Sequence, residues 1–316
     1  MSPPFLQEPE EFRQLVDSAD TFLFDCDGVL YLGQQIIENA KAVLDFLRQS
    51  GKRVVFVTNN STRSRRQLKA NFDQLGLGAS LDECFGSPYA SAVYLKEVLK
   101  FPSDKKVYVF GHEGIEEELD EVGIAHCGGS DPDDRSFDAE NDDHSIYQNL
   151  DPNVGAVLCG ADNWINYKKI TKAVTYLHNP DCKLILTNPD HAYPGQSGIF
   201  PAAGAISSPI VYASRRTPLI IGKPSKIMLD AVNAHHHIDP ARTIMIGDNL
   251  YTDIEFGINS GIRTVLVLSG VTKSISDIKI THNKSQTLYH NRTFFHYSLP
   301  YLVVEVSSFT IHVLNQ

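Results

Sequence analysis

Short, continuous apolar runs alternate with helix-like segments along much of this chain, and this rhythm constrains the fold more than any other feature. Two runs near the amino end are Thr21–Phe24 and Val54–Val57, and a segment with helical spacing, Ala40–Gln49, lies between them. Uninterrupted apolar strands separated by helices are typical of a parallel sheet that is covered on both faces. We therefore expect an α/β fold.

Three later runs have the same character, at Leu219–Ile221, Thr243–Ile246 and Thr264–Leu268. The first four of the five runs end in polar or charged residues. In open parallel sheets the ligand crevice lies at the carboxyl ends of the strands. The residues that we expect to converge there are Asp25, Asp27, Thr58, Lys223 and Asp248.

A long stretch between the second and third runs has a strand–helix rhythm of its own. Its apolar runs are Val107–Phe110, Val154–Cys159 and Leu184–Leu186, and Tyr167–Leu177 is a candidate helix. The stretch is large enough to form a second domain. Within it, the acidic segment Ser130–Asp143 is interpreted as a solvated loop.

Length and charge set outer limits on organisation and function. The 316 residues suit two ordinary domains. The predicted division is a core domain in two parts, 1–101 and 217–316, with an inserted α/β cap domain at 102–216. A net charge of −10 argues against a nucleic-acid binder, which would need a basic face. It permits a phosphate-handling enzyme, because such a site needs only one or two local cations and a metal.

Several sequence features that would indicate a membrane, secreted or zinc-binding protein are absent, and this limits the cellular compartment that we expect. No apolar run approaches the length of a membrane span, and the opening MSPPFLQEPE is not a signal segment. The five cysteines are scattered without CxxC spacing, which argues against zinc. We therefore expect a reduced, cytoplasmic protein with no membrane or nucleic-acid partner. For Cys26 an inert, buried thiol is the favoured interpretation and redox control the minor one.

The segment Asp25-Cys26-Asp27-Gly28 is the first element of a candidate active site. Residues two apart in an extended segment face the same way, so both carboxylates can serve one site. Adjacent like charges in a dry site are costly unless a cation neutralises them. Magnesium, a hard ion that prefers oxygen ligands, fits. Taken alone, DxDG is equally consistent with an acidic turn after a strand.

Two further segments offer groups that bind phosphate. Thr58 supplies a hydroxyl, and Asn59 and Asn60 supply amides, although such a run alone is more often a capped turn. Lys223 would supply a point charge for a phosphoryl group, although a surface lysine is the usual case.

The segment Gly247-Asp248-Asn249 with Asp253 places two acids five residues apart. The first acid is a candidate magnesium ligand, and the second is a candidate support for Lys223 or for the loop. The alternative is a helix N-cap with an acid in the first turn.

In their order these elements resemble the haloacid dehalogenase superfamily, whose pattern is DxDGxL…[ST]N…K…GDxxxxD. One branch of this superfamily looks especially similar to the chain in seven segments: FLFDCDGVLYLG, FVTNNST, YASAVYL, VFGHEGI, TNPD, GKPS and MIGDNLYTDI. That branch is the 4-nitrophenylphosphatase and phosphoglycolate phosphatase family, which includes the pyridoxal phosphatases, and its fungal members look nearest. The resemblance, from about Thr21 to Val271, implies a Rossmann-like core with a large α/β cap. It also implies cytosolic metabolite phosphatase activity and frequent dimerisation through the cap.

The resemblance also implies a role for each matching residue. Asp25 would be the nucleophile and Asp27 the general acid and base. The implied magnesium ligands are Asp25, the backbone carbonyl of Asp27, and Asp248, with Asp253 supporting the metal site. The residues implied on the phosphate side are Thr58, Asn59, Asn60 and Lys223.

These roles predict a magnesium-dependent phosphatase that hydrolyses small phosphate monoesters, such as phosphoglycolate or 4-nitrophenyl phosphate, through an aspartyl-phosphate on Asp25. Two alternatives stay open: a phosphotransferase or mutase with the same nucleophile, and a non-catalytic regulatory protein on this fold. The candidate cap loop facing the substrate is Thr187–Asp190 with His191 and Tyr193. Its alternative is a plain turn at Asn-Pro.

The sequence departs from the family pattern after Lys273. The family usually closes with a short strand and helix, whereas this tail is aromatic, basic and rich in alternating apolar residues. Within it, Tyr301–Ser307 is the candidate for the final strand. We expect the tail to be less ordered than the core or to pack irregularly.

Overall fold

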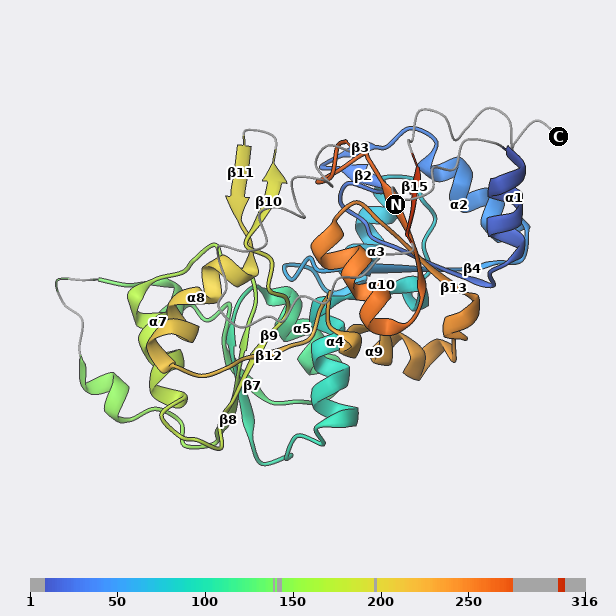
Figure 1. The fold of residues 1–316 in the computed structure, drawn as a ribbon. Coiled ribbons are helices and arrows are strands. Elements are labelled where there is room, and N and C mark those ends of the chain that lie inside the picture. The colour runs from blue at the N-terminus through green and yellow to red at the C-terminus, as the bar shows by residue number, and fades with distance from the viewer. Residues whose placement is uncertain (1–8, 139, 141–143, 196–197, 275–300, 305–316) are drawn as a thin grey trace. The chain divides into compact units, whose positions relative to one another are not determined.

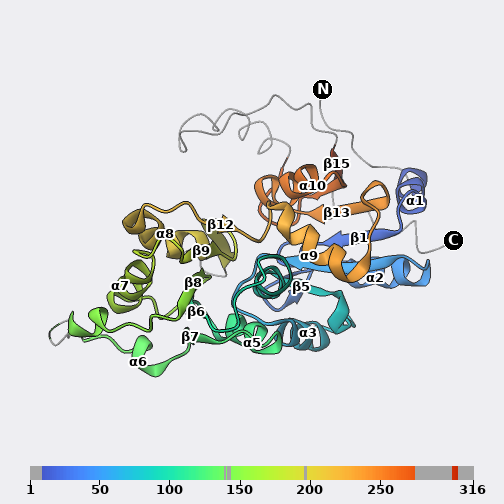
Figure 2. The same ribbon diagram turned by 90° about the horizontal axis from the view of Figure 1, so that it is seen from below.

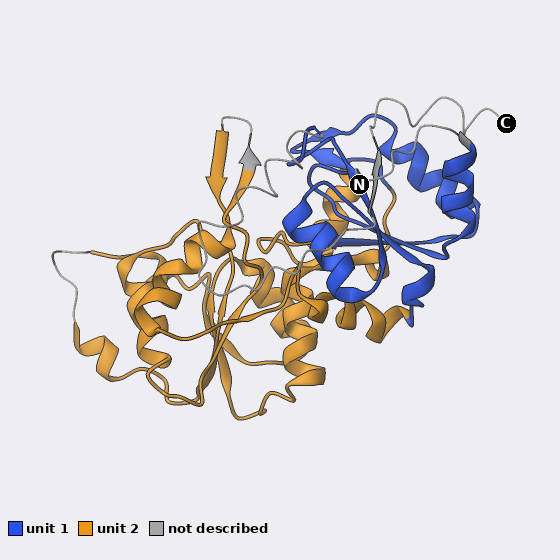
Figure 3. Ribbon diagram, in the orientation of Figure 1, with its two compact units in different colours: residues 1–57, 75–77, 237–316 blue, residues 58–74, 78–236 orange. Residues whose placement is uncertain are grey.

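The computed structural model describes residues 9–138, 140, 144–195, 198–274 and 301–304, and the chain divides into two compact units (Figure 3). Unit 1 comprises residues 1–57, 75–77 and 237–316, and unit 2 comprises residues 58–74 and 78–236. Unit 2 contains the whole range predicted for the cap domain, together with flanking segments. The boundaries at 101/102 and 216/217 stay predictions, because they follow the sequence insertion and not this division.

Unit 1 is built on a parallel sheet with the strand order β15-β14-β13-β1-β4. Its strands are β1 (Thr21–Phe24), β4 (Arg53–Thr58), β13 (Thr243–Gly247), β14 (Arg263–Val267) and β15 (Tyr301–Val304). Figure 2 shows β1 beside β13, and Phe24 pairs with Ile246 on one side and Phe56 on the other. All four residues of β1 are buried, as a continuous apolar run predicts for a central strand.

Helices and short elements complete unit 1. They are α1 (Pro9–Asp17), β2 (Tyr31–Leu32), β3 (Gln35–Ile36), α2 (Ala40–Gln49), η4 (Pro240–Arg242), the π-helix η5 (Leu250–Ile254) and α10 (Glu255–Ser260). Helix α2 has the predicted bounds and buries Ala40, Leu44 and Leu47. It stops before Gly51, whose φ of 70° lies in the left-handed region that ends many helices.

Unit 2 contains a second parallel sheet, with the order β12-β9-β8-β6-β7. Its strands are β6 (Lys106–Phe110), β7 (His126–Gly128), β8 (Val154–Cys159), β9 (Lys183–Leu186) and β12 (Leu219–Ile220). Its core joins Phe110, Val157 and Leu184 of the strands to Ala173 and Ile210 of the helices. The fold is therefore α/β, as expected, with helices packed on parallel sheets (Figure 1).

The remaining elements of unit 2 are mostly helices. They are α3 (Arg65–Gln74), η1 (Leu81–Glu83), β5 (Cys84–Gly86), α4 (Ser87–Val93), the π-helix η2 (Tyr94–Val98), α5 (Glu113–Glu121), α6 (Pro132–Arg135), η3 (His144–Gln148), α7 (Tyr167–Tyr176), α8 (Ala203–Ser214) and α9 (Lys226–His236). An antiparallel hairpin, β10 (Ala192–Gly195) with β11 (Gly198–Pro201), projects from the unit (Figure 1). None of the helices in the described ranges is long and apolar enough to cross a bilayer.

Two sequence predictions need correction. The run Leu219–Ile221 was expected in the same sheet as Thr21–Phe24, but β12 pairs with β9 in unit 2, where Leu219 lies opposite Ile185. The predicted loop Ser130–Asp143 contains the one-turn helix α6, because the Asp131 side chain accepts a hydrogen bond from the amide of Asp133 and caps it.

The carboxyl-terminal tail adds one described strand, β15. Tyr301–Val304 pairs in parallel with β14, which supports the prediction of a final strand for this part of Tyr301–Ser307. The expectation of lower order after Lys273 falls almost entirely outside the described residues.

Candidate active site

The sheet of unit 1 itself places Asp25. The amide of Asp25 donates to the carbonyl of Ile246 at 2.9 Å, so the residue extends the pairing of β1 with β13 by one step. The chain then turns sharply, and Gly28 adopts a φ of 89° that side chains rarely tolerate. Asp25 is buried, whereas Asp27 is exposed. The two acids of the motif therefore lie in different environments, which suits different chemical tasks.

Asp248 and Asp253 come from the end of β13 and from the π-helix that follows. The carboxylate of Asp253 accepts the amides of Asp248 and Asn249, each at 3.1 Å. Asn249 is the N-cap of η5, because its side chain accepts from the amide of Tyr251. The N-cap interpretation therefore holds for Asn249, while Asp253 fixes the main chain that carries Asp248.

Three carboxylates gather in unit 1. Asp25, Asp248 and Asp253 are all buried, and one oxygen from each lies within 4.8 Å of the others. The backbone crowds Asp248: a Cβ atom added at Gly28 or Gly270 would lie 2.5 or 1.9 Å from its Oδ2 atom. Buried like charges this close repel one another unless a cation neutralises them. The all-oxygen donor set fits Mg²⁺, which prefers carboxylate and carbonyl oxygens.

The predicted phosphate loop begins in unit 2, at the last residue of β4. Thr58 is buried, and its hydroxyl accepts the amide of Asn60 at 3.1 Å. The Asn60 side chain in turn accepts the amide and the hydroxyl of Thr62, at 3.0 and 2.7 Å. The capped-turn interpretation is therefore correct for Asn60, and that turn shapes the loop that follows Thr58.

Asn59 joins this loop to Lys223. Its Nδ2 atom donates to the backbone carbonyl of Lys223 at 2.9 Å and to the carboxylate of Asp190 at 3.1 and 3.2 Å. Lys223 is only 1% exposed, so it is not the surface lysine that was the usual alternative. Burying an ammonium group without partners costs free energy, so a buried lysine is more often one with a specific binding role than one that only covers the surface.

The candidate cap loop divides into two parts. Thr187 and Asn188 are buried, and Asp190 is bound to Asn59. His191 and Tyr193, by contrast, are exposed on the way into the hairpin, where the Tyr193 ring stacks on Phe200. Asn188 does form the predicted turn, because its Oδ1 atom accepts the Asp190 amide at 3.1 Å, and the Asp190 side chain also bonds Asn59. A role of this loop toward the substrate stays a prediction.

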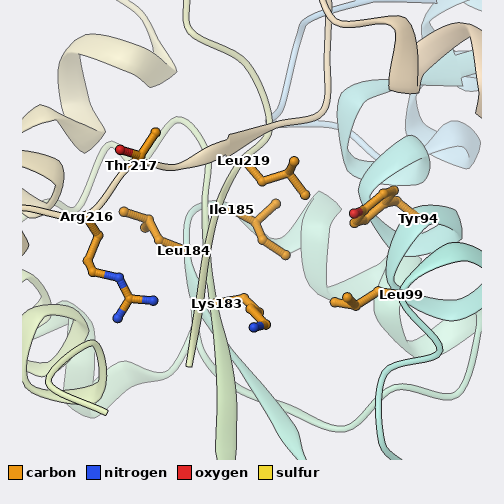
Figure 4. A pocket seen from close by; sticks show the side chains of 8 residues that line it. All are labelled: Tyr94, Leu99, Lys183, Leu184, Ile185, Arg216, Thr217 and Leu219. Carbon is orange, nitrogen blue, oxygen red and sulfur yellow. The ribbon is translucent and has the colours of Figure 1, made fainter. Parts of the chain in front are cut away.

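A separate hollow of about 270 Å³ lies along β9 and β12 of unit 2. Figure 4 shows Leu184, Ile185 and Leu219 between Arg216 and Tyr94. One of its two cations, Arg216, is already engaged, because its guanidinium donates to four backbone carbonyls between residues 177 and 182. The residues that line the hollow include no acid, histidine or cysteine, so the carboxylate cluster remains the candidate site.

The structure thus gathers the predicted residues into two groups, each within one unit. Asp25, Asp248 and Asp253 meet in unit 1, and Asn59, Asp190 and Lys223 meet in unit 2. The predicted cap loop included Asn188 but gave its side chain no role, whereas in the structure that side chain donates to the Asn59 carbonyl at 2.7 Å. No local sequence pattern reports a bond that spans 129 positions.

Comparisons with known proteins identify the family to which the chain belongs. Residues 22–125 match the family model for haloacid dehalogenase-like hydrolases, and residues 220–289 match a second model of HAD-hydrolase-like proteins. The 4-nitrophenylphosphatase of Schizosaccharomyces pombe is 44% identical over 85% of this chain and 90% of its own length. Phosphoglycolate phosphatase 1A, chloroplastic, of Arabidopsis thaliana is 43% identical over 89% of this chain and 76% of its own. The solved p-nitrophenyl phosphatase of Archaeoglobus fulgidus superimposes with a TM-score of 0.72, at 26% identity, covering 92% of this chain and 97% of its own.

Parallel sheets, an acidic cluster at a strand end and these matches define a haloacid dehalogenase-like hydrolase, and the chain belongs to that family. Within the family it is a phosphatase of the 4-nitrophenylphosphatase and phosphoglycolate phosphatase type, an enzyme that hydrolyses phosphate monoesters.

Proposed function

We propose that this phosphatase is magnesium-dependent and hydrolyses small phosphate monoesters through an aspartyl-phosphate on Asp25. The observation that carries the proposal is the buried group of Asp25 and Asp248, at the ends of adjacent parallel strands, and Asp253 in the following η5. Ligands of open parallel sheets bind at this edge.

The residues that would hold Mg²⁺ are Asp25, the backbone carbonyl of Asp27, and Asp248. Asp253 would keep Asp248 in place through the two amides that it accepts. When bound, the ion would offset the charge on the transferring phosphoryl group.

The proposed reaction has two steps. A carboxylate oxygen of Asp25 attacks phosphorus, the ester P–O bond breaks, and Asp27 gives its proton to the leaving oxygen. Asp27 then takes a proton from water, whose oxygen attacks phosphorus and breaks the bond to Asp25. The residues proposed to bind the phosphoryl oxygens are Thr58, Asn59, Asn60 and Lys223. The exposure of Asp27 supports its role, because the leaving group and the attacking water must both reach its carboxyl group.

The proposed substrates are phosphoglycolate and similarly small phosphates. The names of the two relatives support this choice, since one is a 4-nitrophenylphosphatase and the other a phosphoglycolate phosphatase. A cytoplasmic location is proposed as well, on the ground that all five cysteines are free. Cys26 is fully buried, which favours the inert-thiol interpretation over redox control.

We also propose a homodimer formed through unit 2. The support is a set of exposed apolar side chains, Tyr193, Ile199 and Phe200 on the hairpin and Tyr212 on α8, which we together call the hairpin surface. Tyr193 and Phe200 share one face of the hairpin, and Ile199 lies on the other. Large exposed apolar side chains gathered on one element commonly mark interaction sites.

Substitution of the two aspartates tests the mechanism. Asp25→Asn removes the nucleophile, so we expect no burst of product. Asp27→Asn keeps the nucleophile but loses the base, and losing such a group lowers the rate about 100- to 10,000-fold. With 4-nitrophenyl phosphate, a good leaving group, this variant should release up to one nitrophenolate per site and stall as phosphoenzyme. With phosphoglycolate it should fail at the first step.

Rapid-quench measurements on both variants with both substrates check these outcomes. A burst from Asp25→Asn would remove Asp25 as the nucleophile. Steady turnover of phosphoglycolate by Asp27→Asn at the wild-type rate would remove Asp27 as the acid. Transfer of phosphate from the enzyme to an added sugar, in preference to water, would favour the phosphotransferase alternative.

A further inference from the structure

Asn59 lies at the centre of a hydrogen-bond network that joins three loops of unit 2. Its Nδ2 atom donates to the Lys223 carbonyl at 2.9 Å. The same atom donates to the Asp190 carboxylate, whose two oxygens lie at 3.1 and 3.2 Å. Asn59 thereby links the loop after β4 to the loop after β9 and to the loop after β12.

This network permits only one orientation of the Asn59 amide. A flipped amide would place its oxygen against the Asp190 carboxylate and the Lys223 carbonyl, both of which are acceptors only. Gly222 makes room for the amide oxygen, since a Cβ atom there would lie 2.5 Å from it. The Asp190 carboxylate thus orients the Asn59 amide, and the absence of a side chain at Gly222 leaves room for the amide oxygen.

Asn188 holds the main chain of the same network. Its Nδ2 atom donates to the Asn59 carbonyl at 2.7 Å, and its Oδ1 atom accepts the Asp190 amide at 3.1 Å. Asn188 is only 2% exposed, so water does not compete for these bonds. The Asn59 carbonyl has a second donor in Ser87, and the Gly222 amide donates to the Thr187 carbonyl at 2.8 Å.

We propose that Asn188 and Asp190 are positioning residues of this phosphatase. They hold Asn59 and, through it, the main chain of Lys223, so that the phosphate-binding residues of unit 2 share one geometry. The proposal rests on the proposed function, because it concerns the residues assigned there to phosphate. According to the proposal, Asp190 supports, through Asn59, the binding of the phosphoryl group that all substrates share. It does not contact the part by which substrates differ.

A double-mutant cycle, measured with two substrates, distinguishes support of phosphate binding from contact with the rest of the substrate. A misplacement of about 1 Å in a catalytic geometry lowers rates by about 100-fold, so Asp190→Ala should lower kcat/KM by roughly 10- to 100-fold. The factor should be the same for 4-nitrophenyl phosphate and phosphoglycolate, and inhibition by inorganic phosphate should weaken in parallel. In an Asn59→Ala background, Asp190→Ala should cause almost no further loss, since it acts through Asn59.

Two variants serve as controls. Asp190→Asn keeps an oxygen that can accept from Asn59, so it should retain most of the activity. Asp181→Ala removes an exposed carboxylate at the opposite end of β9 and should leave kcat/KM unchanged. If Asp190→Ala does not fold, as judged by thermal unfolding, the same cycle with Asp190→Ser and Asn59→Ser decides.

Independent, multiplicative losses in the double variant would overturn the proposal. So would a loss confined to phosphoglycolate, because Asp190 would then contact the rest of the substrate. Failure of the proposed function would appear differently, as an absence of phosphate release by the unmodified protein.

Discussion

At the scale of single residues, the close packing around the carboxylate cluster depends on two glycines. Gly28 and Gly270 let the main chain approach Asp248 more closely than any other residue would allow. Gly28 has a second reason to be glycine, because its φ of 89° is strained for residues with a Cβ atom.

Gly28→Ala is therefore expected to displace the Asp248 carboxylate and weaken Mg²⁺ binding about tenfold or more, in line with losses seen for residues that support metal ligands. The left-handed backbone should also lower the free energy of unfolding by about 1–2 kcal/mol. Isothermal titration with Mg²⁺ and urea unfolding measure the two effects separately.

Gly51→Ala is the matched control, since Gly51 has a φ of 70° but no atom within 4 Å of the added Cβ. It should lose stability and keep its Mg²⁺ affinity. Equal Mg²⁺ affinity in both variants would show that Gly28 does not shape the metal site.

Proximity of site residues was predictable from sequence where the motif is local. The GDxxxxD spacing relates Asp248 to Asp253, and these two carboxylates do lie close together, whereas the exposed Asp27 of DxDG is not in the cluster with Asp25. The bond between Asn59 and Asp190 spans 131 positions, and no local pattern reports a pairing at that separation.

At the scale of elements, strand positions were predictable because buried strands are short, continuous apolar runs. Predicted bounds such as Thr21–Phe24 and Val154–Cys159 coincide with β1 and β8. The sheet to which a strand belongs was less predictable. Strand β12 has only two residues, and nothing in so short a run distinguishes β9 from another partner.

Helices α3 and α5 meet at a buried acid, Glu118. Its carboxylate accepts the Arg65 amide and lies 3.6 Å from the Arg65 Nε atom, while the Arg65 guanidinium stacks on Tyr89. Burial raises the pKa of Glu118 to about 7, against the lowering effect of Arg65 and with a further rise from Glu121 and Glu117. The folded protein therefore holds this proton at a pH where the unfolded chain has released it.

Because the pKa is higher in the folded state, Glu118 contributes stability below about pH 4.5, and this contribution is lost as pH rises to about 7. In Glu118→Gln that part of the pH dependence should disappear, which amounts to roughly 3 kcal/mol at most. Urea unfolding between pH 5 and 8, followed by the fluorescence of the single tryptophan, Trp164 in unit 2, measures it. Identical pH profiles for the variant and the wild type would contradict the assignment.

At the scale of the whole molecule, the hairpin surface carries the prediction of assembly. Ile199 is 82% exposed, and an aspartate there would place a charge in the proposed contact. We expect Ile199→Asp to raise the dimer dissociation constant at least tenfold, since a buried, unpaired charge is strongly unfavourable. Sedimentation velocity over a range of concentrations measures the change.

Val98→Asp is the control, because Val98 is also exposed, at 62%, but belongs to η2 and not to the hairpin surface. It should sediment like the wild type. A wild-type protein that stays monomeric at high concentration, or equal effects of both substitutions, would contradict a dimer through this surface.

The network around Asn59 has a consequence for attempts to redesign substrate choice. Libraries that randomise the whole segment from Thr187 to Phe200 would also replace Asn188 and Asp190. Because these residues position the phosphate-binding side chains, binding of the phosphate that every substrate carries would be lost as well. Most members of such a library should be inactive for all substrates. Libraries that keep these two residues and vary the exposed His191, which lies outside the hairpin surface, should yield far more active enzymes, and selectivity should be sought among those.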